Sequence, residues 1–221
     1  MPKTILLLLS ALSFFPCLAQ TKGLPASYQL VQDVKGDLDK DGIEELVEVY
    51  NTKPLQPGNV QDGIDRELII FKRQGNDWVI WQRSSQAVYK SNEGGMMGDP
   101  FEAVDISNGI LLIAHNGGSS WKWGHTDKYR FQNGRFELIG YTSLYGKDCE
   151  QWSRFDYNIS TGIINFYKDM DECDENGEPK KVNSTLSERF THKLKQPITL
   201  QERRKEQVKI ITPKNKEELY L

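Results

Sequence analysis

Short apolar or alternating runs, each closed by a turn signal, constrain this chain more than any other feature. They extend from about residue 28 to residue 168, and no long stretch has the 3.6-residue spacing of an amphipathic helix. Alternation at every second residue suits a strand with one buried face. The sequence therefore predicts an all-β fold of antiparallel hairpins, with strands at 46–51, 67–72, 77–82, 101–106, 110–115, 128–131, 136–141, 150–158 and 163–169.

Two Asn-Gly dipeptides, at 108–109 and 133–134, predict the tightest hairpins. Both residues tolerate the positive φ that a type I′ turn demands. The passages 41–82 and 108–141 share a plan of loop, apolar strand, charged strand, glycine turn and aromatic strand. This plan predicts sheet modules of a small β-propeller-like domain. A two-sheet sandwich would leave almost the same trace.

One helix signal follows near the C-terminus. Thr199 and Glu202 stand three residues apart, the spacing of a capping box, in which two side chains close the first turn of a helix. We therefore expect a short C-terminal helix over 200–208.

The segment 36–45 has the pattern of a calcium-binding loop. Asp37, Asp39 and Asp41 stand on alternate positions, and Gly42 follows them directly. Ca²⁺ takes six to eight oxygen ligands, which alternate acids on a curled loop supply while the glycine permits the turn. The alternative is a solvated acidic turn that holds no ion.

Two glutamates compete for the last ligand position. Glu48 completes the twelve-residue EF-hand pattern, but an EF-hand needs flanking helices and these flanks are β-like. On an outgoing strand Glu45 and Glu48 lie about 10 Å apart on opposite faces, so one ion does not use both. Glu48 then remains a surface or cross-strand charge. We expect a structural Ca²⁺ held by one carbonyl and four carboxylates, those of Ile43 and of Asp37, Asp39, Asp41 and Glu45.

Residues 1–19 have the features of a secretory signal peptide, with Lys3, an apolar run and a cleavage site after Ala19. The run is shorter than the roughly 20 apolar residues of a membrane span. We therefore expect an exported protein, periplasmic or secreted, with residues 20–221 as a single β-rich calcium-binding domain. Loss of Lys3 leaves 27 of the 28 basic residues against 31 acidic ones, a net charge of −4. Nothing in this balance attracts nucleic acid, and no later segment is apolar enough to span a membrane.

Cys149 and Cys173 are the two cysteines of the predicted mature chain, and an exported protein is expected to pair them. Thr161, in the turn between the strands 150–158 and 163–169, lies midway between them. A hairpin would therefore bring the cysteines opposite each other, as a disulfide requires. The alternative is two free thiols.

Trp121 and Trp123 form a second candidate site, for binding a partner. Two residues of the same parity face the same side of a strand, and exposed aromatic rings anchor a protein partner or stack on a sugar. The alternative is a pair of core tryptophans at the start of a strand.

A catalytic interpretation is weaker. His115, His125 and Asp127 lie close in sequence to Ser119 and Ser120, and a serine nucleophile needs a histidine base and an orienting acid. The serines lie in a glycine-flanked loop without a Gly-x-Ser-x-Gly elbow. The histidines also lack the spacing and the third ligand of a zinc site.

The loop Gly36-Asp37-x-Asp39-x-Asp41-Gly42-x-x-Glu45 resembles the calcium loop of FG-GAP or VCBS-type β-propeller repeats. The stretches 129–141 and 158–162 are similar to a group of small exported bacterial proteins with a propeller-like fold. That group includes immunity proteins against cell-wall hydrolases, and its fold is shared by inhibitors of invertebrate-type lysozymes. The Ser-Gly-x-x-Tyr finger of those inhibitors does not occur here, so no inhibitory residue is carried over.

The resemblance implies a protein that binds and blocks a peptidoglycan-cleaving enzyme. We therefore expect a non-enzymatic, calcium-stabilised binding protein with a protein partner. Two alternatives remain open: a carbohydrate-binding envelope module that uses Trp121 and Trp123, and a hydrolase that uses His115 or His125.

Overall fold

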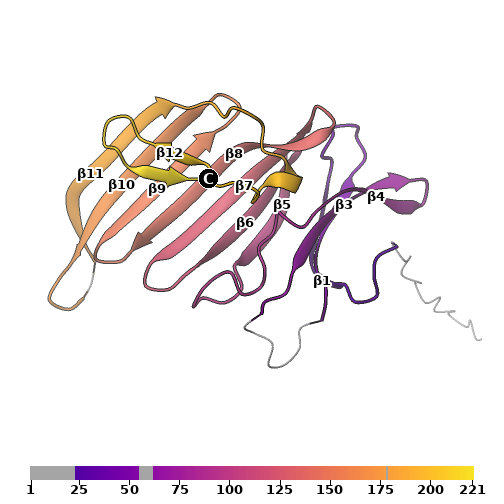
Figure 1. Cartoon of the computed structure of the whole chain (residues 1–221), viewed down its shortest axis with the longest axis horizontal. Helices are drawn as coiled ribbons and strands as arrows, with labels where there is room; N and C mark the ends of the chain where they lie inside the picture. Colours follow the sequence, from indigo (N-terminus) through magenta and orange to yellow (C-terminus); the bar gives the residue numbers. More distant parts are fainter. Residues whose placement is uncertain (1–22, 55–61, 178) are drawn as a thin grey trace, which may run out of the picture.

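The computed structural model describes residues 23–54, 62–177 and 179–221. Within these residues the fold is all-β, with two large antiparallel sheets, a small two-stranded sheet and one turn of helix (Figure 1). The predicted signal peptide lies outside the described residues. No helix in the described part of the chain is long and apolar enough to cross a membrane.

The first sheet holds four strands in chain order. Its side chains alternate between two apolar faces: Val47 and Val49 join the main core, whereas Leu46 and Tyr50 pack on the other face under Tyr28. Because both faces are covered, the central strands read as nearly continuous apolar runs. The strands are β1 Gln29–Gly36, β2 Glu45–Asn51, β3 Arg66–Gln74 and β4 Asp77–Ser84.

The second sheet is an antiparallel meander of seven strands. Figure 1 shows it as one broad sheet with the four-stranded sheet beside its β5 edge. The side-chain amide of Gln32 joins the two sheets, because it donates to the Val104 carbonyl (3.0 Å) and accepts from the Val104 N–H (3.0 Å). The strands are β5 Phe101–Ser107, β6 Ile110–Gly118, β7 Lys122–Gln132, β8 Arg135–Lys147, β9 Gln151–Asn158, β10 Ile163–Cys173 and β11 Pro179–Thr191.

The predicted tight turns are confirmed. Asn108 and Asn133 have φ of 53° and 54°, and the glycines that follow both have φ of 76°. Positive φ at both central residues is the type I′ geometry that matches the twist of a hairpin. The β5–β6 and β7–β8 connections therefore follow from local turn chemistry.

The C-terminal segment crosses one face of the seven-stranded sheet, as Figure 1 shows in yellow. It contains the short helix η1 Leu200–Glu202 and the strands β12 Lys209–Ile211 and β13 Glu218–Tyr220. Four apolar side chains of this segment are buried in the main core: Leu200, Ile210, Leu219 and Leu221. The segment thus covers part of the sheet face and leaves the remainder open.

The prediction of a helix over 200–208 is only partly right, because the structure has a three-residue 3₁₀ helix there. Thr199 makes no capping bond to the backbone with its side chain; its hydroxyl donates instead to Glu202 Oε2 (2.9 Å). Without a satisfied cap and without further turns, the helix does not propagate.

The all-β prediction is confirmed, and each predicted strand coincides with an observed one. β1 and β11 were not predicted, and the strands predicted at 128–131 and 136–141 are shorter than the observed β7 and β8. The passage 41–82 includes β2 to β4, whereas 108–141 runs through β6, β7 and part of β8 within the longer sheet. That second passage is therefore not a separate module. No described sheet closes into a barrel.

Cys149 and Cys173 are joined in a disulfide, as their spacing predicted. The β9–β10 hairpin pairs Asn158 with Ile163 next to its turn and Gln151 with Met170 towards its open end. The Cα atoms of the cysteines lie 4.8 Å apart just beyond the last pair. The bridge therefore closes the open end of the hairpin.

Candidate functional site

The predicted calcium loop connects β1 to β2 and begins where Gly36 pairs with Glu45. Lys40 and Gly42 have φ of 64° and 87°, so the backbone curls in the left-handed region twice within three residues. Leu38 is buried in the main core with 1% of its surface exposed. One buried apolar side chain therefore anchors a loop whose other apolar side chain, Ile43, is 54% exposed.

Hydrogen bonds hold the loop closed. Both carboxylate oxygens of Asp37 accept backbone N–H groups, from Asp41 (3.2 Å) and from Gly42 (3.0 Å). Glu45 Oε2 accepts the Leu38 N–H (2.7 Å). The acids at the two ends of the loop thus bind its backbone, and these bonds define its shape.

The structure brings three of the predicted ligands together. Asp37, Asp39 and Glu45 each place a carboxylate oxygen within 4.8 Å of the other two. Asp41 is not part of this group, and its Oδ1 accepts the Ile43 N–H (2.8 Å). An all-oxygen donor set of this kind suits a hard divalent cation such as Ca²⁺.

Lys72 of β3 reaches the same loop, which the sequence did not indicate. Its Nζ forms an ion pair with Asp39 and lies 3.5 Å from Asp41 and 3.7 Å from Glu45. Burial alone would lower the pKa of Lys72, but the bond to Asp39 and the charges of these acids raise it. The arrangement therefore attracts positive charge, and Lys72 would compete with a metal ion.

One oxygen of the loop has no partner. Asp39 Oδ1 is buried and makes no hydrogen bond, although buried polar atoms are usually satisfied. Burial raises the pKa of Glu45, the Leu38 N–H lowers it, and the charge of Asp39 raises it again, with a net increase. Both observations fit a loop that has spare capacity to bind a cation.

Glu48, which was predicted to be a surface or cross-strand charge, does not lie at the surface. It lies on the face of β2 opposite Glu45, as predicted, but only 4% of its surface is exposed. The Tyr50 hydroxyl donates a hydrogen bond to Glu48 Oε2. The four-stranded sheet is covered on both faces, so this glutamate is buried and hydrogen-bonded instead of solvated.

The two predicted partner-binding tryptophans have different surroundings. Trp121 lies just before β7, and its ring stacks on Tyr145 of β8 with centroids 5.2 Å apart. Trp123 lies within β7 and stacks on His125, with centroids 5.7 Å apart. Trp123 lines a cleft on the sheet face that the C-terminal segment crosses, whereas Trp121 lies outside its lining.

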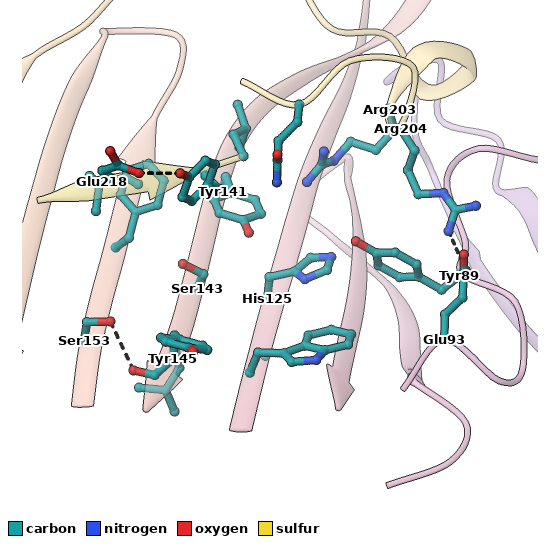
Figure 2. A pocket seen from close by; sticks show the side chains of 18 of the residues that line it. Tyr89, Glu93, His125, Tyr141, Ser143, Tyr145, Ser153, Arg203, Arg204 and Glu218 are labelled. Carbon is teal, nitrogen blue, oxygen red and sulfur yellow. Dashed lines mark hydrogen bonds and ion pairs between the residues drawn. The ribbon is translucent and has the colours of Figure 1, made fainter. Parts of the chain in front are cut away.

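We call this feature the aromatic cleft; its volume is about 890 Å³. Figure 2 shows His125 between Tyr141 and Tyr89, with Arg203 and Arg204 above them. The sheet supplies the floor, the C-terminal segment one wall, and the loop after β4 the other. Its lining includes Gln86, Tyr89, Glu93, Trp123, His125, Tyr141, Ser143, Tyr145, Ser153, Arg203, Arg204, Glu206, Gln207 and Glu218.

His125 lies in the cleft floor, and His115 is buried next to it. His115 and His125 are paired across β6 and β7, with ring centroids 5.2 Å apart. Burial lowers the pKa of His115 to about 2 and also lowers the pKa of His125. The Tyr89 N–H donates to His115 Nε2 (3.3 Å), so the proton of this neutral imidazole is on Nδ1.

Two arginines from the C-terminal segment complete the cleft. Arg203 Nε donates to Asp127 Oδ2 (2.8 Å), and this ion pair is almost fully buried. Burial alone would lower the pKa of Arg203, but the charge of Asp127 raises it. Arg204 pairs with Glu93 (2.6 Å) and lies over the Tyr89 ring. Sequence reasoning missed both arginines, since they stand 76 and 111 residues from their partners.

The residues of the catalytic interpretation do not form a triad. Ser119 and Ser120 are exposed in the β6–β7 turn. His125 pairs across strands with Ser143, and the described residues show no hydrogen bond between these two side chains. The metal-competent group found among those residues is the acidic loop, which leaves His115 and His125 outside it.

Comparison of the chain with protein families, with curated proteins and with solved structures gave no match. The acidic loop, the aromatic cleft and their surroundings are therefore the features from which a function can be inferred.

Proposed function

We propose that this protein is an exported, non-enzymatic binding protein that recognises another protein, with Ca²⁺ stabilising its acidic loop. The observation that carries the proposal is a group of large apolar side chains, three exposed and one half-buried, at one end of the seven-stranded sheet. We call this group, which consists of Met96, Met97, Trp121 and Tyr145, the apolar rim.

The exposure of the rim is unusual for its residue types. Met96 is 88% exposed, Met97 51% and Tyr145 46%. Soluble proteins rarely gather large apolar side chains on the surface without a partner, and methionine adapts to irregular partner surfaces. A stacked Trp121–Tyr145 pair adds the aromatic anchor that is common in protein interfaces.

The rim is held in place by backbone contacts. The Gly118 N–H donates to the Gly94 carbonyl (2.8 Å), and the Met97 N–H donates to the Gly118 carbonyl (3.2 Å). A Cβ on Gly117 would lie 2.8 Å from the Gly94 oxygen and 2.5 Å from the Trp123 ring, so only glycine fits there. The glycines of both segments therefore allow the methionine loop to lie against the strand, which limits the entropy lost on binding.

The similarity of residues 129–141 and 158–162 to a group that includes immunity proteins against cell-wall hydrolases supports a peptidoglycan-cleaving enzyme as the partner. It also supports a propeller-like arrangement of the sheets; a sandwich is the alternative. Ca²⁺ would bind Asp37, Asp39 and Glu45 and supply charge neutralisation to the loop. Export follows from the signal-like segment at residues 1–19.

The test is capture from an envelope extract by immobilised protein, with the retained proteins identified by mass spectrometry. The wild type and a Met170→Asp control should both retain a peptidoglycan-cleaving enzyme, because Met170 is 39% exposed on β10 and does not belong to the rim. The double variant Met96→Asp/Met97→Asp should lose it. Equal retention by all three proteins, or retention of no such enzyme, would contradict the proposal.

A further inference from the structure

The aromatic cleft adjoins the apolar rim and shares Tyr145 with it, but the protein-binding proposal does not use the rest of its lining. Its volume of about 890 Å³ lies within the range of roughly 300–1,000 Å³ that is typical of small-ligand pockets. It is formed by a continuous sheet and a segment packed on it, so its floor is rigid. The chemistry of the lining decides which class of ligand it suits.

The cations of the lining are already paired with acids. Arg203 and Arg204 are its only cations among the described residues, and both are paired, with Asp127 and with Glu93. An anionic ligand would have to displace one of these acids. Glu206 and Glu218 also line the cleft, which makes a phosphate or a carboxylate still less favourable.

The remaining polar groups are neutral and numerous. Ser143 and Ser153 offer hydroxyls, Gln86 and Gln207 offer amides, and the tyrosines of the lining offer phenols. Each of these groups both donates and accepts hydrogen bonds. A ligand rich in hydroxyls can bond to such a lining both as a hydrogen-bond donor and as an acceptor.

The rings of Trp123, His125 and Tyr141, which we call the ring column, supply an apolar platform. Trp123 stacks on His125 at an interplanar angle of 17°, and His125 meets Tyr141 with centroids 5.6 Å apart. Trp123 is partly exposed and lines the cleft, so part of its indole is available to a further ring. The C–H face of a pyranose is apolar and flat enough to take that position, while its hydroxyls point towards polar neighbours.

Unsatisfied buried atoms support the same ligand class. His115 Nδ1, Asp127 Oδ1 and Arg204 Nε are buried without a hydrogen-bond partner. His115 and Asp127 are only 2% and 1% exposed, and both contact residues of the cleft wall. Two donors and one acceptor thus lie in or directly behind the lining, where ordered water that bridges to the hydroxyls of a ligand would complete their bonding.

We propose that the aromatic cleft binds a neutral saccharide, with its ring on Trp123 and its hydroxyls on the serine, amide and tyrosine groups of the lining. This site is separate from the recognition of a protein through Met96 and Met97. It makes the protein a binder of two kinds of ligand.

The experiment is isothermal titration of the calcium-loaded protein with cellotriose, maltotriose and triacetylchitotriose, and with trigalacturonate as an anionic comparison. At least one neutral sugar should bind with a Kd of about 1 mM or tighter. Trp123→Ala should weaken that binding at least tenfold. Trp152→Ala is the matched control, because Trp152 lies on β9 and outside the cleft lining. Where Trp123→Ala does not fold, Trp123→Phe keeps a ring in the column and should still weaken binding.

Three results would overturn the proposal: no binding of any neutral sugar, tighter binding of trigalacturonate, or equal binding by the Trp123 and Trp152 variants. Binding of a proline-rich peptide at Trp123 without sugar binding would also overturn it. The Met96→Asp/Met97→Asp variant should bind sugar normally, so failure of this inference is distinguishable from failure of the protein-binding proposal.

Discussion

Replacing Lys72 with methionine should weaken the ion-free protein and strengthen its binding of Ca²⁺. The variant removes the ammonium that pairs with Asp39 and lies near Asp41 and Glu45, but it keeps most of the apolar stem. Without calcium, these acids then repel one another without a counter-charge. With calcium, the ion no longer has to displace an ammonium from the loop.

The magnitude follows from the partial exposure of the pair. A hydrogen bond between charged groups contributes about 1.5–3 kcal/mol, and solvent screening reduces this to about 1–2 kcal/mol, since the Lys72 side chain is 28% exposed. The ion-free variant should therefore unfold about 2–8 °C below the wild type. By the thermodynamic cycle, the same 1–2 kcal/mol returns as a calcium affinity about 5–30-fold higher.

Calorimetric titration of Ca²⁺ into chelator-treated protein measures the affinity, and thermal melts with and without calcium measure the stability. Both proteins should be stabilised by about 2.7 kcal/mol at a hundredfold excess over their own Kd. Lys90→Met is the control, because Lys90 pairs with Asp65 away from the loop. An affinity that is unchanged or lower in Lys72→Met would refute the competition between ammonium and metal, and absence of heat in both proteins would refute the calcium site.

Three further predictions concern stability. Burial lowers the pKa of His115 to about 2, so below about pH 6.5 the unfolded chain binds a proton that the folded protein does not. The free energy of unfolding should therefore fall by about 1.4 kcal/mol per pH unit below pH 6.5. Urea titrations of His115→Gln should show a smaller fall per pH unit. Arg203→Met leaves Asp127 buried without its ion-pair partner and should lower the free energy of unfolding by about 3–5 kcal/mol. The double variant Arg203→Met/Asp127→Asn should recover much of this loss. Additive losses in a double-mutant cycle would argue against coupling between Arg203 and Asp127. Reduction of the Cys149–Cys173 bridge should lower the free energy of unfolding by about 2–4 kcal/mol, and an unchanged melting temperature in dithiothreitol would contradict this.

The features that the sequence predicted well are local in the chain. The strands follow from alternation over a few residues, and the Asn-Gly turns follow from the positive φ of adjacent residues. The disulfide required only the hairpin that places Cys149 near Cys173. The acidic loop is likewise contained in about ten residues, so its backbone bonds to Asp37 and Glu45 reflect one short segment.

The strands that were missed show the limit of local patterns. β1 carries the charges of Asp33 and Lys35 and lies at an edge of the four-stranded sheet, and β11 forms one edge of the seven-stranded sheet. The helix predicted over 200–208 failed because Thr199 bonds the Glu202 side chain and packing of Leu200 and Ile210 on the sheet determines the path of the segment.

The sequence by itself determined the all-β class, the order of hairpins, the cysteine pair and the acidic loop, because each depends on neighbours in the chain. Only the tertiary structure brought Lys72 into that loop, buried Glu48 and His115, and placed Arg203 on Asp127. These contacts join residues from different strands and from the C-terminal segment, which no periodicity or spacing encodes. Burial and long-range charge pairing, which control the chemistry of both candidate sites, exist only once the sheets and the C-terminal segment have packed together.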